Sequence, residues 1–124
     1  MSHIPFSRAP QFSVPNVTFT GLASPQRGST DNSVWHITIA PNSPGLLHQL
    51  TREEIIVATS GQAKAEIGGK HYTLEAGDAI VVPPGQDFAL SNDGKTAFTA
   101  IAVLPVGGQA VIGGEQPFTP PWAA

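Results

Sequence analysis

Apolar and polar residues alternate along much of this chain with a period of two, which is typical of strands that bury one face. In residues 62–67, for example, Ala63, Ala65 and Ile67 alternate with polar side chains. Similar short segments recur between turn-forming residues. The pattern predicts strands over residues 17–22, 33–40, 46–50, 54–59, 62–67, 70–74, 79–82, 88–90 and 96–104. One further small hairpin is predicted over residues 105–114.

Glycine and proline separate these segments and argue against long helices. The chain contains 13 Gly and 12 Pro, and no stretch shows a helical period. The pair Gly68-Gly69 is a hairpin signal, because glycine accepts positive φ at both central positions of a tight turn. About nine to eleven short, evenly spaced strands predict an all-β sandwich or barrel.

The 124 residues are enough for one domain, and its two ends differ from its centre. Residues 1–16 carry three prolines and no periodic pattern, so we expect an extended N-terminal arm. Residues 17–112 form the predicted barrel. Residues 113–124 form a Pro-rich, extended C-terminal tail, in which Trp122 is expected to pack over a barrel mouth or against a partner.

Charge and composition exclude several classes of function. A net charge of −3 without a basic stripe does not fit nucleic acid binding. The chain has no cysteine, which excludes disulfides and thiolate metal sites and fits a reducing cytoplasm. Neither a signal peptide nor an apolar run of about 20 residues is present, so we expect no membrane segment and a cytoplasmic location.

Two groups of residues with regular spacing lie on either side of the Gly68-Gly69 hairpin. In the first group, His48 is followed by Leu50, then by Glu54 after three intervening residues, and by Gly61 after six more. In the second group, a glycine is followed after five residues by Pro-x-Gly. Two residues later comes a position that is phenylalanine here, and after three more residues an asparagine. Its members are Gly77, Pro83, Gly85, Phe88 and Asn92.

This spacing resembles the two motifs of the cupin superfamily, in which a histidine stands at the positions of Leu50 and Phe88. The resemblance implies a single jelly-roll barrel, also called a double-stranded β-helix. Cupins that bind a metal use two histidines and the glutamate of the first motif and one histidine of the second. By this resemblance only His48 and Glu54 remain as ligands, and the metal site is degenerate.

Because side chains alternate along a strand, His48 and Leu50 share one face of their strand. Glu54 and Ile56 likewise share one face of theirs. In a barrel, the inner wall near the site is expected to contain Leu50, Ile56, Phe88 and Leu90, with Trp35 or His36 joining according to register. This is an apolar pocket with one imidazole and one carboxyl group, a composition common at small-molecule sites.

Our preferred hypothesis is a small-molecule-binding cupin that works without a metal. His48 and Glu54 would then catalyse acid–base chemistry of the isomerase, lyase or cyclase type. The expected ligand is a small apolar or carbonyl-containing molecule. Burial disfavours the charged carboxylate, whereas a nearby imidazolium favours it, so the sequence leaves the protonation state of this pair open.

Three alternatives remain open at this stage. A metal-dependent oxygenase or isomerase would need a divalent Fe, Mn, Zn or Ni ion held by His48, Glu54 and His36, since three protein ligands are usual at such sites. The barrel would otherwise bind an apolar molecule without chemistry. In the third alternative, His48 and Glu54 have no function and pair with each other only as a remnant of the metal site that satisfies buried polar groups.

The arm also bears on assembly. In the small cupins that this chain resembles, two copies commonly pair through their N-terminal arms or edge strands. Such pairing protects the exposed hydrogen-bonding groups of an edge strand. The resemblance therefore implies a homodimer formed through residues 1–16.

Overall fold

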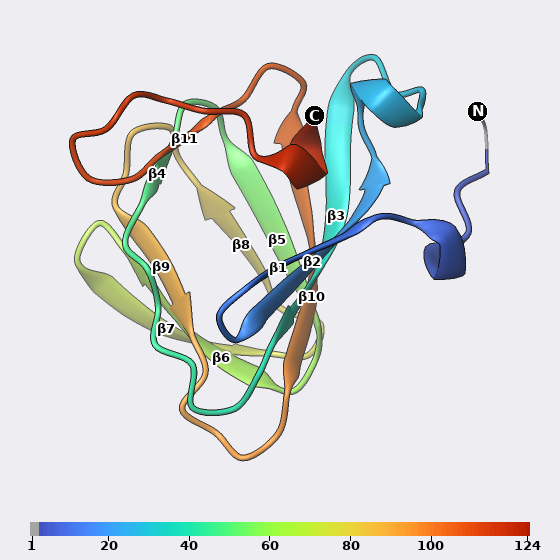
Figure 1. The fold of residues 1–124 in the computed structure, drawn as a ribbon. Helices are drawn as coiled ribbons and strands as arrows, with labels where there is room; N and C mark the ends of the chain where they lie inside the picture. The colour runs from blue at the N-terminus through green and yellow to red at the C-terminus, as the bar shows by residue number, and fades with distance from the viewer. Residues whose placement is uncertain (1–2) are drawn as a thin grey trace.

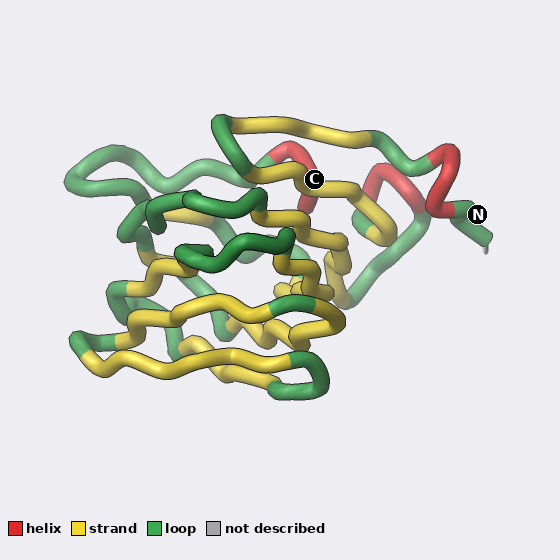
Figure 2. The backbone as a smooth tube through the Cα atoms, turned by 90° about the horizontal axis from the view of Figure 1, so that it is seen from below, coloured by secondary structure: helices red, strands yellow, loops and turns green. Residues whose placement is uncertain are grey.

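The computed structural model describes residues 3–124, and its β-strands form two layers that face each other (Figures 1 and 2). All strand pairs are antiparallel. The larger sheet has six strands, in the order β1 (Gln11–Val14), β2 (Val17–Ala23), β3 (Asn32–Ile39), β10 (Phe98–Pro105), β5 (Glu54–Ser60) and β8 (Ala79–Val82).

The opposite layer is built from two shorter sheets. One contains β7 (Lys70–Glu75), β6 (Gln62–Ile67) and β9 (Phe88–Ser91), and the other contains β11 (Ala110–Val111) and β4 (Gln49–Leu50). Isolated bridges pair Ser43 with Asn92 and His48 with Phe88, so the segment before β4 runs along β9. These bridges join the two short sheets into one layer and complete a jelly roll.

Helix is limited to three 3₁₀ turns within the described residues, namely η1 (Phe6–Arg8), η2 (Pro25–Arg27) and η3 (Pro121–Ala123). None of them is long and apolar enough to cross a membrane. The all-β jelly roll predicted from the alternating pattern is therefore confirmed. The hairpin predicted at Gly68 and Gly69 is also present, with φ values of 55° and 83°.

The two ends of the chain are more structured than the sequence indicated. Residues 11–14 of the arm form β1, which pairs with β2 from Gln11 opposite Thr20 to Val14 opposite Val17. The hairpin predicted over 105–114 is wrong, because β11 pairs with β4 and Ala110 bridges to Phe118. Local pattern alone misses such pairings, since the partner strands are distant in sequence. Residues 1 and 2 of the expected arm lie outside the described residues.

The core lies between the two layers and follows the strand alternation. β3 and β10 bury every second residue, from Trp35 to Ile39 and from Phe98 to Leu104. The buried hydrophobic residues form one cluster, in which Phe98, Ala100, Ala102 and Leu104 are 0% exposed. Their packing leaves an open cavity beside this cluster, toward the C-terminal tail.

Candidate active site

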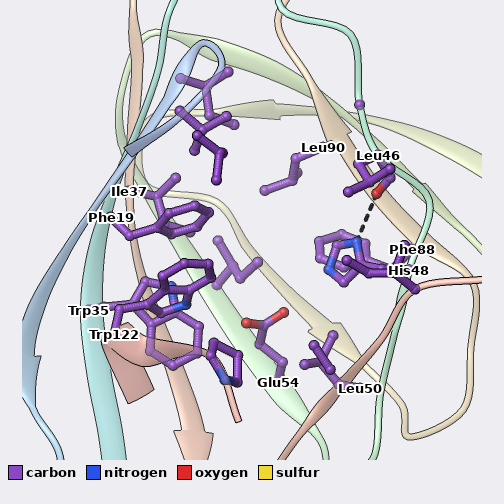
Figure 3. A pocket seen from close by; sticks show the side chains of 18 of the residues that line it. Phe19, Trp35, Ile37, Leu46, His48, Leu50, Glu54, Phe88, Leu90 and Trp122 are labelled. Carbon is purple, nitrogen blue, oxygen red and sulfur yellow. Dashed lines mark hydrogen bonds between the residues drawn. The ribbon is translucent and has the colours of Figure 1, made fainter. Parts of the chain in front are cut away.

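An apolar cavity of about 700 Å³ opens between the two sheets. Its wall includes strands of both layers, the turn between β1 and β2, and the C-terminal tail (Figure 3). Among residues 3–124, the only ionisable side chains in the wall are those of His48 and Glu54. A cavity of this size and composition is suited to a small organic molecule with few polar groups.

Five of the residues expected in the pocket lie in this wall. They are Trp35, Leu50, Ile56, Phe88 and Leu90. Leu50, Ile56 and Phe88 are between 1% and 3% exposed, so they form its floor and sides rather than its rim. The structure thus brings together residues from β3, β4, β5 and β9 around His48 and Glu54.

His36 does not belong to this group, and its expected place in the pocket is wrong. It alternates with the buried residues of β3 and therefore points to the outer face of the sheet. There its ring packs edge-on against Phe6 of the N-terminal arm, with ring centroids 5.2 Å apart. Burial in this contact lowers the pKa of His36.

Glu54 is the first residue of β5 and points into the barrel, because β5 buries its alternate residues from this position. The residue is 4% exposed, and its carboxyl group points into the cavity (Figure 3). Burial away from water disfavours the charged form and raises the pKa of Glu54 to about 8. The side chain is therefore mostly a neutral acid near neutral pH, able to donate a proton.

His48 lies just before β4 and is held by its backbone. Its N–H donates to the Phe88 carbonyl at 2.9 Å, and its carbonyl accepts from the Phe88 N–H at 2.8 Å. The imidazole Nδ1 lies 2.8 Å from the Leu46 carbonyl oxygen, which only accepts, so Nδ1 carries the proton. Burial lowers the pKa of His48, although this backbone bond partly opposes the shift. The neutral ring thus leaves the Nε2 lone pair free.

The structure does not join these two side chains directly. Within residues 3–124, no ion pair or hydrogen bond links His48 to Glu54. The idea that they form a remnant pair is therefore wrong. Each group faces the apolar cavity separately, and the fold arranges one neutral acid and one neutral base around the same space.

The donor set does not fit a metal held by three or more protein ligands. Leu50 and Phe88 occupy the two remaining positions of the predicted motifs, and neither side chain has a lone pair for a metal. No group of three or more His, Cys, Asp or Glu side chains with suitable placement occurs in the described part of the chain. The ligand set that included His36 is not formed, because that side chain lies outside the barrel.

Sequence reasoning expected Trp122 over a barrel mouth or against a partner, but it did not place Phe19 or the turn at residues 14–17 in the cavity wall. Phe19 of β2 and Trp122 of η3 stack face to face in it, with ring centroids 3.7 Å apart and an interplanar angle of 5°. The aromatic residue in the Pro-rich tail was the available signal, and Trp122 does pack over the barrel opening. Nothing in the local pattern indicated that Phe19 or the turn at residues 14–17 would join it.

One polar atom in the wall lacks a partner. The indole Nε1 of Trp35 is buried and makes no hydrogen bond within the described structure. A buried donor without an acceptor costs about 1–3 kcal/mol.

The fold and the cavity define a jelly-roll protein with an apolar interior cavity. The family model described as "Cupin domain" matches residues 35–104, which is 70 of the 124 residues. The chain therefore belongs to the cupin family, as its motif spacing predicted. No curated protein sequence matches it significantly.

Several solved structures share this fold at low sequence identity. The polyketide cyclase RemF from Streptomyces resistomycificus is 16% identical with a TM-score of 0.75, and the match covers 85% of this chain and 79% of that one. A predicted oxalate decarboxylase from Thermotoga maritima is 20% identical with a TM-score of 0.73, covering 84% and 98%. A cupin sugar phosphate isomerase from Silicibacter pomeroyi is 16% identical with a TM-score of 0.69, covering 82% and 68%. At these identities the likeness shows the fold alone.

Proposed function

We propose that this cupin binds an apolar carbonyl compound and catalyses proton transfer on it without a resident metal. Glu54 acts as the general acid and His48 as the general base. One observation supports this assignment above the others: a neutral carboxyl group and a neutral imidazole with a defined tautomer face the same apolar cavity without neutralising each other. Environments that separate two titratable groups in this way are typical of acid–base sites.

The proposed step is enolisation of the bound carbonyl compound. His48 Nε2 takes a proton from the carbon next to the carbonyl group, and the electron pair of the broken C–H bond forms a C=C bond. The carbonyl oxygen takes the proton of the Glu54 carboxyl group, which becomes a carboxylate. Returning a proton to a different carbon completes an isomerisation, and attack of the enol carbon on a second carbonyl within the same molecule completes a cyclisation.

The wall chemistry also supports an apolar ligand. Within the described part of the chain neither Lys nor Arg lines the cavity, so no cationic side chain found there would neutralise a phosphate or sulfate group. Among the structures of similar fold, the name of a polyketide cyclase agrees better with this wall than the name of a sugar phosphate isomerase.

Deuterium exchange tests the proposal without knowledge of the natural substrate. Apolar ketones such as 2-acetylnaphthalene are incubated with the protein in D₂O, and loss of the α-proton signal is followed by NMR. Wild type is expected to accelerate exchange, whereas His48→Ala and Glu54→Gln abolish it and still bind the ketone. The rate should stay level from near neutral pH to about 8 and fall above it, because Glu54 then loses its proton.

The chain provides a matched control of the same residue types. His71 and Glu66 approach to 4.0 Å on the outside of β6 and β7, and neither lines the cavity. The variants His71→Ala and Glu66→Gln should exchange at the wild-type rate. If the ketones bind but wild type accelerates no exchange, the cavity only binds ligands and the catalytic proposal fails.

Metal content gives an independent test. Protein purified without a polyhistidine tag is analysed for Fe, Mn, Zn and Ni, and we expect less than stoichiometric amounts. One bound ion per chain, lost in Glu54→Gln and His48→Ala, would overturn the metal-free proposal. We also propose a cytoplasmic location, which is consistent with a cysteine-free chain.

A further inference from the structure

Three exposed apolar side chains stand at the opening of the cavity. Val14 at the end of β1, Leu46 before β4 and Phe118 in the tail all line the cavity wall. They are nevertheless 47%, 61% and 39% exposed, so they form its rim. Single exposed apolar side chains are common on protein surfaces. Three that come from distant segments and meet at one opening are different, because such a patch marks a ligand-binding groove.

The backbone holds each residue of the rim in place. Val14 belongs to the ladder between β1 and β2. Phe118 exchanges two backbone hydrogen bonds with Ala110, of 2.8 and 3.0 Å. The carbonyl oxygen of Leu46 lies 2.8 Å from His48 Nδ1. The rim is therefore preformed, and a ligand does not need to order these segments when it binds.

The two ionisable groups of the cavity lie deeper than the rim. Glu54 is 4% exposed, His48 is half-buried, and Leu46 is the most exposed of the three (Figure 3). Among residues 3–124 no other ionisable side chain lines the cavity. A ligand with a single carbonyl group would therefore place it beside Glu54 and direct the rest of its body past His48 toward the rim.

We infer that the ligand is an elongated apolar ketone that enters carbonyl first, and that the rim binds the part of its chain that emerges from the barrel. The inference rests on the proposed function for the place of the carbonyl group. The rim then distinguishes long ketones from short ones, because a short ketone ends inside the barrel and does not reach it. A carboxylate of the same length is disfavoured, since its charge would lie unpaired beside Glu54 in an apolar wall.

Chain length provides the first test. The compounds 2-pentanone, 2-octanone and 2-undecanone are titrated into wild type by calorimetry, with undecanoate at neutral pH as the charged control. A fully buried CH₂ group strengthens binding about fourfold, so a CH₂ half-covered by the rim should add about twofold. The compound 2-undecanone should then bind about eightfold more tightly than 2-octanone. Undecanoate should not bind measurably.

Rim variants locate this effect. Leu46→Ser and Val14→Ser change exposed side chains in two distant segments, so the fold should tolerate at least one of them. Each should weaken 2-undecanone at least about threefold and leave 2-pentanone within about twofold of wild type. Leu47→Ser is the matched control, because Leu47 is 46% exposed and does not line the cavity. This control should bind all three ketones like wild type.

The direction of entry has a separate measurement. A water-soluble paramagnetic chelate is added to the complex with 2-undecanone, and the NMR signals of the two terminal methyl groups are compared. The chelate is too large to enter the barrel. It should broaden the methyl signal at the far end of the chain and spare the methyl group beside the carbonyl.

Equal weakening of 2-undecanone by Leu46→Ser, Val14→Ser and Leu47→Ser would overturn the inference. Broadening of the methyl group beside the carbonyl with protection of the far one would do the same, because the ketone would then enter chain first. Deuterium exchange on the same ketones keeps the proposed function separate. Exchange without a rim effect overturns only this inference, and rim-dependent binding without exchange overturns only the acid–base function.

Discussion

At the scale of single residues, the fold holds Glu54 away from water and gives it no cation. The cost of burying a charged carboxylate in an apolar wall is avoided because the group keeps its proton. Burial also favours the neutral form of His48, but for an imidazole this lowers the pKa, whereas it raises the pKa of the Glu54 carboxyl group. The two shifts together keep the cavity free of charge near neutral pH, which suits an apolar ligand.

The raised pKa of Glu54 predicts a loss of stability with rising pH. Over most of the interval between pH 6.5 and 8 the folded chain keeps the Glu54 proton and the unfolded chain does not, so the free energy of unfolding falls with pH. His48 acts in the opposite direction, because its unfolded imidazole is half protonated at pH 6.5 while burial lowers the pKa of the folded one, and it offsets only a small part of this loss, at most about 0.4 kcal/mol. Urea unfolding at the two pH values should show a net loss of about 1 to 1.5 kcal/mol in wild type, because the full slope is about 1.36 kcal/mol per pH unit and declines as folded Glu54 ionises near pH 8.

Glu54→Gln removes the titrating group and keeps the size of the side chain. The difference in unfolding free energy between pH 6.5 and 8 should then largely disappear. Glu66→Gln on the surface serves as the control and should keep the wild-type dependence. Equal pH dependence in wild type and Glu54→Gln would contradict a buried, neutral Glu54.

His48 and Glu54 were found from spacing in the sequence, because the two motifs set which strand positions face inward. His36 shows the limit of that reasoning. Its strand was predicted correctly, but which face of β3 turns inward depends on where β2 and β10 pair with it. Once Trp35 points into the barrel, His36 must point out.

At the scale of elements, the C-terminal tail acts as a wall of the cavity. The carbonyl of Trp122 accepts a hydrogen bond from Arg27 Nη2 at 3.2 Å, and that of Ala123 accepts one from Ser33 Oγ at 2.7 Å. These bonds attach η3 to η2 and β3, which lie about 90 residues earlier in the chain. Alternation and turn residues predicted the strands well, yet a Pro-rich segment has no period from which such contacts follow.

Trp122→Ala tests the tail as a wall. The change removes the stack on Phe19, and we expect a loss of about 2 kcal/mol in unfolding free energy, less than for a fully buried tryptophan. Binding of 2-acetylnaphthalene should weaken as well. Urea unfolding and a ligand titration by NMR measure the two effects. Phe118→Ala, on the same tail but 39% exposed, should cost less than half as much stability. Equal losses in both variants would count against a special role of the stack.

At the scale of the whole molecule, two distant parts of the sequence enclose the cavity. The central motifs supply His48, Glu54 and the apolar floor, and the turn at residues 14–17 and the tail close the opposite side. The sequence predicted the jelly roll because strand period and motif spacing agree with each other. It did not predict the final shape of the cavity, since this depends on pairing of both ends with the barrel.

This arrangement makes ligand binding visible in intrinsic fluorescence. The chain has two tryptophans, and both Trp35 and Trp122 line the cavity. Saturable quenching by 2-acetylnaphthalene is therefore expected, with partial quenching left in Trp35→Phe and in Trp122→Phe. Ligand at 100 times its dissociation constant should also raise the unfolding free energy by about 2.7 kcal/mol. Glucose 6-phosphate, which finds no cation in the wall, should do neither. Quenching that rises linearly without saturation and leaves stability unchanged would mean that the ketone collides with the surface and never enters the barrel.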